Sequence, residues 1–271
     1  QKICLMHGME VDYYKKLFQT IGNIIVLIEK DDIPKYLLFL ENAFPYMDNY
    51  NYYKGMNGII QELTGLLKTK NIGTDSDRAL LLDFQATLET KPEKAIKLEK
   101  DALAQIENIT ADNARLVSNL HANLGGLYRM NGHPDLAREH MEKSISLLDQ
   151  FNLLHINDSI PQIANYAMFL TEQQEPERGI SELQKLSGII KEYHSDDCLD
   201  YAKVQENLGT IYLMTANLPQ AKTHFKRAFK IYEKIWADEP EMIEAKYQEI
   251  QELYPQIGFC IGKNLSGLLT K

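Results

Sequence analysis

The sequence of 271 residues has little cysteine, a single tryptophan and no long apolar run. The three cysteines, Cys4, Cys198 and Cys260, are odd in number and far apart, which favours a reducing compartment over a disulfide framework. The longest apolar run, Ile24 to Ile28, is too short to cross a bilayer, for which about 20 apolar residues are needed. The sequence therefore predicts neither a disulfide-stabilised fold nor a membrane span.

Positive charge is also scarce. Lysine and arginine number 29 against 38 aspartates and glutamates, for a net charge of −9 and a pI near 5.3. Nucleic acid is an unfavourable partner for such a chain, because neutralising phosphates requires a basic face. A stripe of Lys222, Lys226 and Lys230 is adequately explained as a solvated outer helix face. Hydrophobic residues make up 44% of the chain, enough for a packed core.

Motifs of catalysis and cofactor binding are missing as well. No GxxxxGK[ST] or GxGxxG loop is present, and the seven histidines show no HExxH or paired-cysteine spacing. The stretch from His194 to Cys198 gathers reactive residue types, but nothing orders them as nucleophile and base, so a polar loop is the better interpretation. We expect no enzyme activity, no cofactor and no metal site.

The chain opens at Gln1, with no charged and then apolar leader. This favours a piece of a longer cytoplasmic protein, with a processed secreted protein as the alternative.

A helical hairpin is predicted over 118–151. Its first half places one stripe on a helix, its second half places another, and the turn lies at Asn131-Gly132. Small residues on each stripe allow the helices to approach closely, and bulky ones fill the gaps beside them. The stripes are Leu124, Gly125 and Tyr128, then Ala137, Met141 and Ser144.

The pattern repeats at intervals of 42 residues, which identifies a repeat protein. Three turns carry proline at or just before the second helix, at Pro134, Pro176 and Pro219, and support the same register. One interval before the hairpin, Asp83 stands where a small residue is expected. The later copies are Tyr166-Ala167-Leu170 with Gly179, Leu183 and Leu186, and Leu208-Gly209-Tyr212 with Ala221, Phe225 and Ala228.

These residues resemble the tetratricopeptide repeat, with Leu-Gly/Ala-x-x-Tyr on helix A and Ala-x-x-x-Phe-x-x-Ala on helix B. The interval of 42 is similar to the long repeats of kinesin light chain and of the sensor arms of bacterial signal-transduction ATPases. The resemblance implies an all-α, right-handed superhelical solenoid of antiparallel helix pairs. HEAT and armadillo repeats have similar periods but lack these paired small residues.

The expected organisation has four parts. An N-terminal helical segment covers 1–33 and a degenerate helical hairpin covers 34–75. Four repeats follow over 76–243, starting near 76, 118, 160 and 202, and a terminal helix pair over 244–271 closes the stack.

One column of helix A residues is the candidate binding site. Asn123, Asn165 and Asn207 lie 42 residues apart, inside helices that asparagine does not favour. An asparagine amide can pair with both the N–H and the C=O of an extended peptide. The resemblance implies the same, because asparagine at this position lines the peptide groove of kinesin light chain. The alternative explanation is inheritance from one ancestral repeat, or asparagine side chains that satisfy a neighbouring backbone group.

Residues one or two turns away share the predicted face. The methionines among them suit an adaptable apolar floor, and the charges are of mixed sign. A carboxylate clamp for C-terminal acidic peptides is disfavoured, because Ala122, Gly126 and Asn207 replace residues that it needs. The predicted peptide-binding set adds Asn119, Gly126, Arg129, Met130, Met168, Glu172, Lys203, Thr210 and Met214 to the three asparagines.

Two functions follow as expectations. The first is a scaffold whose concave helix A groove binds a protein or peptide segment. The second is a ligand-sensing regulatory arm of a larger signalling protein, a signal-transduction ATPase or a peptide-responsive transcription regulator, with the effector domain in the same full-length chain.

Overall fold

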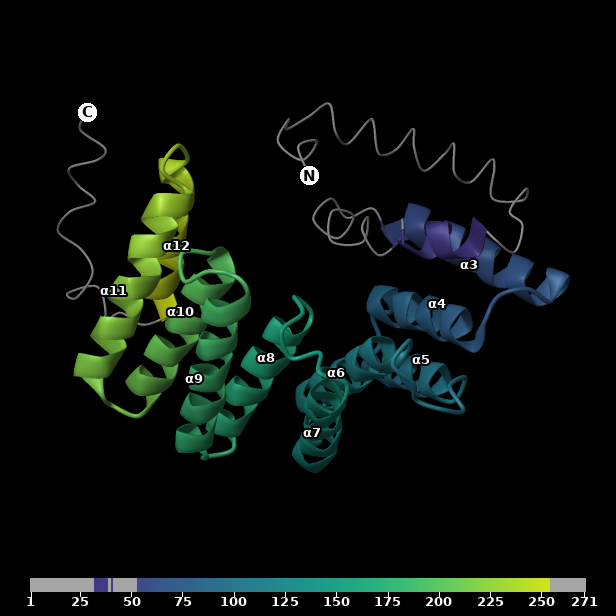
Figure 1. Ribbon diagram of the computed structural model, residues 1–271, viewed down its shortest axis with the longest axis horizontal. Helices are drawn as coiled ribbons and strands as arrows, with labels where there is room; N and C mark the ends of the chain where they lie inside the picture. Colours follow the sequence, from purple (N-terminus) through teal and green to yellow (C-terminus); the bar gives the residue numbers. More distant parts are fainter. Residues whose placement is uncertain (1–31, 39, 41–52, 254–271) are drawn as a thin grey trace. The chain divides into compact units, whose positions relative to one another are not determined.

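The computed structural model describes residues 32–38, 40 and 53–253 (Figure 1). In this part of the chain all regular structure is helical, as expected. The chain divides into two compact units, Gln1–His140 and Met141–Lys271. The expected helices before residue 32 and after residue 253 lie outside the described residues.

Over residues 53–130, the first unit contains three helices followed by a fourth that belongs to the next pair. They are α3 (Tyr53–Lys70), α4 (Asp75–Leu88), α5 (Pro92–Leu103) and α6 (Ala114–Met130). Residues 33–38 are also helical and overlap the start of the short helix expected over Pro34 to Tyr46. Ile33, Leu37 and Leu40 pack with Met56, Ile60 and Leu63 of α3 in one apolar cluster, which is the core of the degenerate hairpin.

The loop between α3 and α4 shows how polar sequence ends one helix and starts another. Asn71 and Gly73 adopt φ of 51° and 86°, the left-handed region that asparagine and glycine tolerate best. Thr74 Oγ1 then accepts a hydrogen bond from the Asp77 N–H at 3.1 Å, and Asp77 Oδ2 accepts one from the Thr74 N–H at 2.6 Å. This capping box satisfies two backbone donors at the start of α4.

Up to residue 253, the second unit contains two complete helix pairs and one further helix. The boundary between the units falls within α7 (Pro134–Gln150). After it come α8 (Ser159–Glu172), α9 (Pro176–Tyr193), α10 (Leu199–Met214), α11 (Leu218–Ile235) and α12 (Pro240–Leu253). Helix α8 contacts α9 and α10, α10 contacts α9 and α11, and α11 contacts α12.

The three hairpin turns have the same backbone conformation at intervals of 42 residues. Gly132, Gln174 and Ala216 all have positive φ, of 76°, 64° and 58°. In each turn the next residue donates its N–H to a carbonyl five residues back, as in a Schellman cap. The sequence predicted these turns, and the structure confirms them. The three bonds are His133 to Tyr128, Glu175 to Leu170 and Asn217 to Tyr212, at 2.9, 2.9 and 2.7 Å.

Small residues bring the paired helices close together, as predicted. A Cβ added to Gly209 of α10 would lie 2.8 Å from the ring of Phe225 of α11, which is fully buried. A Cβ added to Gly179 of α9 would lie 2.5 Å from the carbonyl oxygen of Ala167 of α8. Neither position has room for a side chain, so the apolar interior of the second unit depends on glycine there.

The last helix of the described residues, α12, begins at Pro240, earlier than the expected start near Glu244. Proline is favoured at the first helical position, because its φ is already helical and its missing N–H costs nothing there. Helix α12 joins α10 and α11 through one polar network: Lys246 Nζ lies 2.9 Å from Glu206 Oε1, and Tyr232 donates its hydroxyl to Glu206 Oε2 at 2.6 Å. Burial and the neighbouring Glu206 carboxylate raise the pKa of Tyr232.

Candidate functional site

Two asparagines of the predicted column lie at equivalent positions of neighbouring first helices. Asn165 is exposed on α8 and Asn207 is half-buried on α10, and these two helices are in contact. Within the described part of the chain, neither side-chain amide forms a hydrogen bond, so both retain donors and an acceptor for a ligand. Adjacent helix axes lie about 8–10 Å apart, a distance that an extended peptide covers in about three residues.

The third asparagine of the column is engaged within the protein. Asn123 of α6 donates its amide to Asp83 Oδ1 of α4 at 2.8 Å. The contact joins two side chains of different helices, so it differs from the bond to a neighbouring backbone group that the alternative explanation expects. A ligand at Asn123 would have to share the amide with Asp83 or replace that hydrogen bond.

Asp83 also interacts with a buried carboxyl group, that of Glu99, which the sequence pattern did not predict. Glu99 of α5 is 1% exposed, and its Oε2 has no hydrogen-bond partner among the described atoms. Burial, and secondarily the Asp83 carboxylate, raise the pKa of Glu99 to about 10, so the side chain is protonated at neutral pH. The 42-residue interval held a signal: Asp83 and Glu99 take the places that Gly209 and Phe225 occupy three repeats later.

Histidines on second helices bond to first helices in two alternate repeats. His140 Nδ1 lies 2.9 Å from His121 Nδ1, and His224 Nδ1 lies 2.9 Å from Gln205 Oε1, two repeat intervals later in the sequence. Each ring also stacks on a tyrosine, Tyr128 or Tyr212, at 5.4 and 5.3 Å between centroids. Burial lowers the pKa of both His140 and His224.

The other predicted binding residues differ in how much surface they offer. Met130 and Met214 are 81% and 53% exposed, unusually accessible for large apolar side chains. Thr210 is 8% exposed and offers a ligand little surface. Asn119, Gly126 and Arg129 are half-buried on α6, Met168 packs partly against the core on α8, and Glu172 and Lys203 are exposed on α8 and α10.

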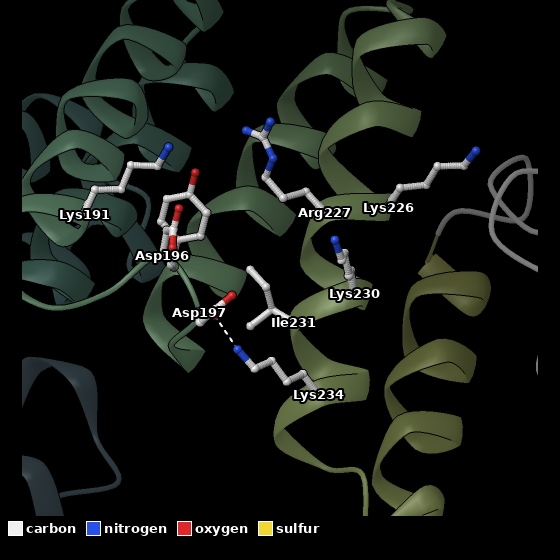
Figure 2. A pocket seen from close by; sticks show the side chains of 9 residues that line it. Lys191, Asp196, Asp197, Lys226, Arg227, Lys230, Ile231 and Lys234 are labelled. Carbon is white, nitrogen blue, oxygen red and sulfur yellow. Dashed lines mark hydrogen bonds and ion pairs between the residues drawn. The ribbon is translucent and has the colours of Figure 1, made fainter.

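Two grooves lie between consecutive second helices of the second unit. The first groove, of about 520 Å³, lies between α7 and α9 over Ile163 and Tyr166 of α8. The second, here called the basic groove, has about 410 Å³ and is lined by nine residues of α9, α10, α11 and the loop before α10 (Figure 2). They are Lys191, Asp196, Asp197, Tyr201, Lys226, Arg227, Lys230, Ile231 and Lys234.

No group of three or more histidine, cysteine, aspartate or glutamate side chains in the described ranges is arranged to hold a metal ion. The loop from His194 to Cys198 provides structural contacts: His194 Nε2 lies 2.9 Å from the carbonyl oxygen of His155, and Cys198 caps α10. No helix of the described residues combines the length and apolarity needed to cross a membrane.

The fold and the turns define an all-α protein of stacked antiparallel helix pairs. The family model of the tetratricopeptide repeat matches residues 159–234, the part that contains α8 to α11. This part of the chain therefore carries tetratricopeptide repeats, as its residue pattern predicted. No curated protein matches its sequence.

Solved structures with a similar fold share little sequence with the chain. Kinesin light chain TPR-like repeats of Podosopora anserina match in two structures. One has a TM-score of 0.61 and 13% identity and covers 78% of this chain and 99% of the other. The second has a TM-score of 0.57 and 14% identity and covers 72% and 93%. BtubC (BKLC) from P. vanneervenii matches with a TM-score of 0.51 and 18% identity over 74% of each chain. At such identities the similarity establishes the fold.

Proposed function

We propose that the protein is a binding scaffold that holds an extended peptide segment of a partner protein on its first helices. Tetratricopeptide repeats generally serve protein interaction and seldom catalysis. The observation that supports the proposal most strongly is the pair of amides of Asn165 and Asn207 on neighbouring helices, with no hydrogen bond to any described residue. Amides so placed can hydrogen-bond peptide backbone and are therefore tolerant of ligand sequence.

The surroundings of the two amides in the second unit suit a mixed ligand surface. Met214 is 53% exposed at the end of α10, and methionine adapts to apolar side chains of different shape. Lys203 and Glu172 supply charges of both signs nearby on the two helices. Asn123 belongs to the other unit and is engaged with Asp83, so the proposal rests on Asn165 and Asn207.

The test begins with a peptide selected from a displayed random library on the wild-type protein. Its dissociation constant is then measured by fluorescence anisotropy for the wild type and for Asn165→Ala/Asn207→Ala. Each lost hydrogen bond costs about 0.5–1.5 kcal/mol, so the double variant should bind about 5 to 150 times more weakly.

The matched control is Gln184→Ala/Gln251→Ala, which removes two exposed helical amides from α9 and α12. It should bind like the wild type. Equal binding by all three proteins would contradict the proposal. The regulatory-arm alternative stays a prediction, and the domain composition of the full-length protein tests it.

A further inference from the structure

The basic groove concentrates positive charge in a protein whose net charge is −9. Five cationic side chains line it, against two carboxylates, Asp196 and Asp197. In Figure 2, Lys191 projects from α9, while Arg227, Lys230 and Lys234 project from α11 around Ile231. Lys226 extends away from Asp196 and marks the outer edge of the groove.

Most of this charge is not neutralised within the protein. Lys234 pairs with Asp197, and Lys191 Nζ lies 5.4 Å from the centre of the Tyr201 ring. Lys226, Arg227 and Lys230 form no ion pair with any residue from 53 to 253. Lys226, Lys230 and Lys234 follow one another at i, i+4 spacing, where like charges cost a few tenths of a kcal/mol each. The arrangement is therefore unfavourable for the isolated protein.

The repeat itself does not explain the charge, because the first groove is its counterpart one repeat earlier. Asp149, Lys185 and Ile189 there become Lys191, Arg227 and Ile231 in the basic groove. The cations of the first groove are also paired. Lys185 Nζ lies 2.8 Å from Glu182 Oε1, and Arg178 pairs with Glu175 and, at 3.7 Å, with Glu142. Of these two grooves of the described residues, only the basic groove carries unpaired positive charge, so the repeat fold does not require it.

The dimensions of the basic groove favour an elongated anionic ligand. Arg227 and Lys234 are seven residues apart on α11, or about 10 Å along the helix. A single phosphate-sized anion can contact only some of the cations along this length. In an extended peptide, side chains that share a face recur every 7 Å or so, so two or three carboxylates can lie along the groove. Ile231 and Tyr201 supply apolar surface for their methylene groups.

We propose that the basic groove binds an extended segment of a partner protein that is rich in aspartate and glutamate. Lys191, Arg227 and Lys230 pair with its carboxylates, and Asp196 and Asp197 repel them at one end, which sets the direction and the end point of the segment. The proposal is independent of the peptide site on the first helices, because the charged residues of the basic groove come from α9, α11 and the loop before α10, and α10 contributes Tyr201 alone.

The probe is a fluorescein-labelled peptide of about ten residues in which glutamate and serine alternate, with glutamine in place of glutamate as the neutral control. Binding is measured by anisotropy at about 50 mM salt and again at higher salt, where screening weakens exposed ion pairs. The groove variant is Arg227→Glu/Lys230→Glu. The matched control, Lys143→Glu/Lys222→Glu, makes the same change of net charge at exposed positions of α7 and α11 outside the groove.

The wild type should bind the acidic peptide and not the neutral one. The groove variant should lose about tenfold or more in affinity, and the control variant less than about threefold. Asp197→Asn should bind the acidic peptide more tightly, because it releases Lys234. A misfolded protein cannot produce that gain. Asn165→Ala/Asn207→Ala should retain the acidic peptide, which separates this site from the proposed one.

Four results would overturn the proposal: no binding of the acidic peptide at low salt, equal losses in the two charge-reversal variants, no gain in Asp197→Asn, or displacement of the peptide by inorganic phosphate or by a single-stranded oligonucleotide at equal concentration. Circular dichroism melts of every variant verify that the fold is intact.

Discussion

Two glycines of α9 provide a sharp test of the helix packing, because the same substitution should have opposite effects at them. A Cβ at Gly179 would lie 2.5 Å from the Ala167 carbonyl oxygen and 2.7 Å from Thr171 Oγ1. These two atoms are already joined by a 3.0 Å hydrogen bond, so neither can move freely. At Gly188 nothing lies within 4 Å, and the residue is exposed.

Gly188→Ala should raise the free energy of unfolding by about 1 kcal/mol, the helix-propensity gain of alanine over glycine. Gly179→Ala gains part of the same helix-propensity stabilisation. Overpacking nevertheless costs about 1–3 kcal/mol, because the backbones of α8 and α9 must move apart. The net result should be a loss of about 1–2 kcal/mol. Urea unfolding followed by circular dichroism measures both changes as shifts of the midpoint at constant slope. Shifts in the same direction would refute the close packing of α8 against α9.

Two pH-dependent predictions follow from buried ionisable groups. The pKa of Glu99 is raised from 4.5 to about 10, so the contribution of its protonated form to stability should be lost as the pH rises between these values. Glu99→Gln should therefore flatten the dependence of the urea midpoint on pH from about 5 to 9. An unchanged slope would show that Glu99 is ionised in the folded protein. Burial lowers the pKa of His140 and His224 from 6.5, so these neutral rings should destabilise the fold as the pH falls below about 6.5. The double variant His140→Gln/His224→Gln should therefore lose less stability than the wild type between about pH 7 and 5. Thermal melts across this range measure the difference, and parallel curves for the two proteins would contradict the assignment.

Features set by local sequence could be predicted well. The turns at Gly132, Gln174 and Ala216 follow from loop-forming residues before a proline, repeated at one interval. Close packing at Gly179 and Gly209 follows from small residues on the facing stripes. Both depend on residues a few positions apart within one hairpin, where backbone preference and helical periodicity determine geometry directly.

Features that depend on side chains of different helices could not be predicted. Asn123 faces Asp83, which is 40 residues earlier, and its amide is engaged for that reason. Lys226 and Lys230 belong to a lysine stripe that the sequence explains as a solvated face, because the sequence does not show that Lys191 and Arg227 border the same groove. The rotation of each helix about its axis and the side-chain rotamers determine which charged side chains lie close together. The repeat register alone specifies neither the rotation nor the rotamers.

The most direct test of the central claim is the behaviour of the two amides themselves. In a ¹⁵N-labelled protein, the side-chain NH₂ resonances of Asn165 and Asn207 are assigned by comparing the wild type with the single alanine variants. The selected peptide is then titrated in. The account predicts that both pairs of resonances shift in proportion to the bound fraction, while that of Asn123 stays near its free position, because its amide donates to Asp83. A peptide that binds while the resonances of Asn165 and Asn207 remain unchanged would contradict the claim that these amides hold the ligand.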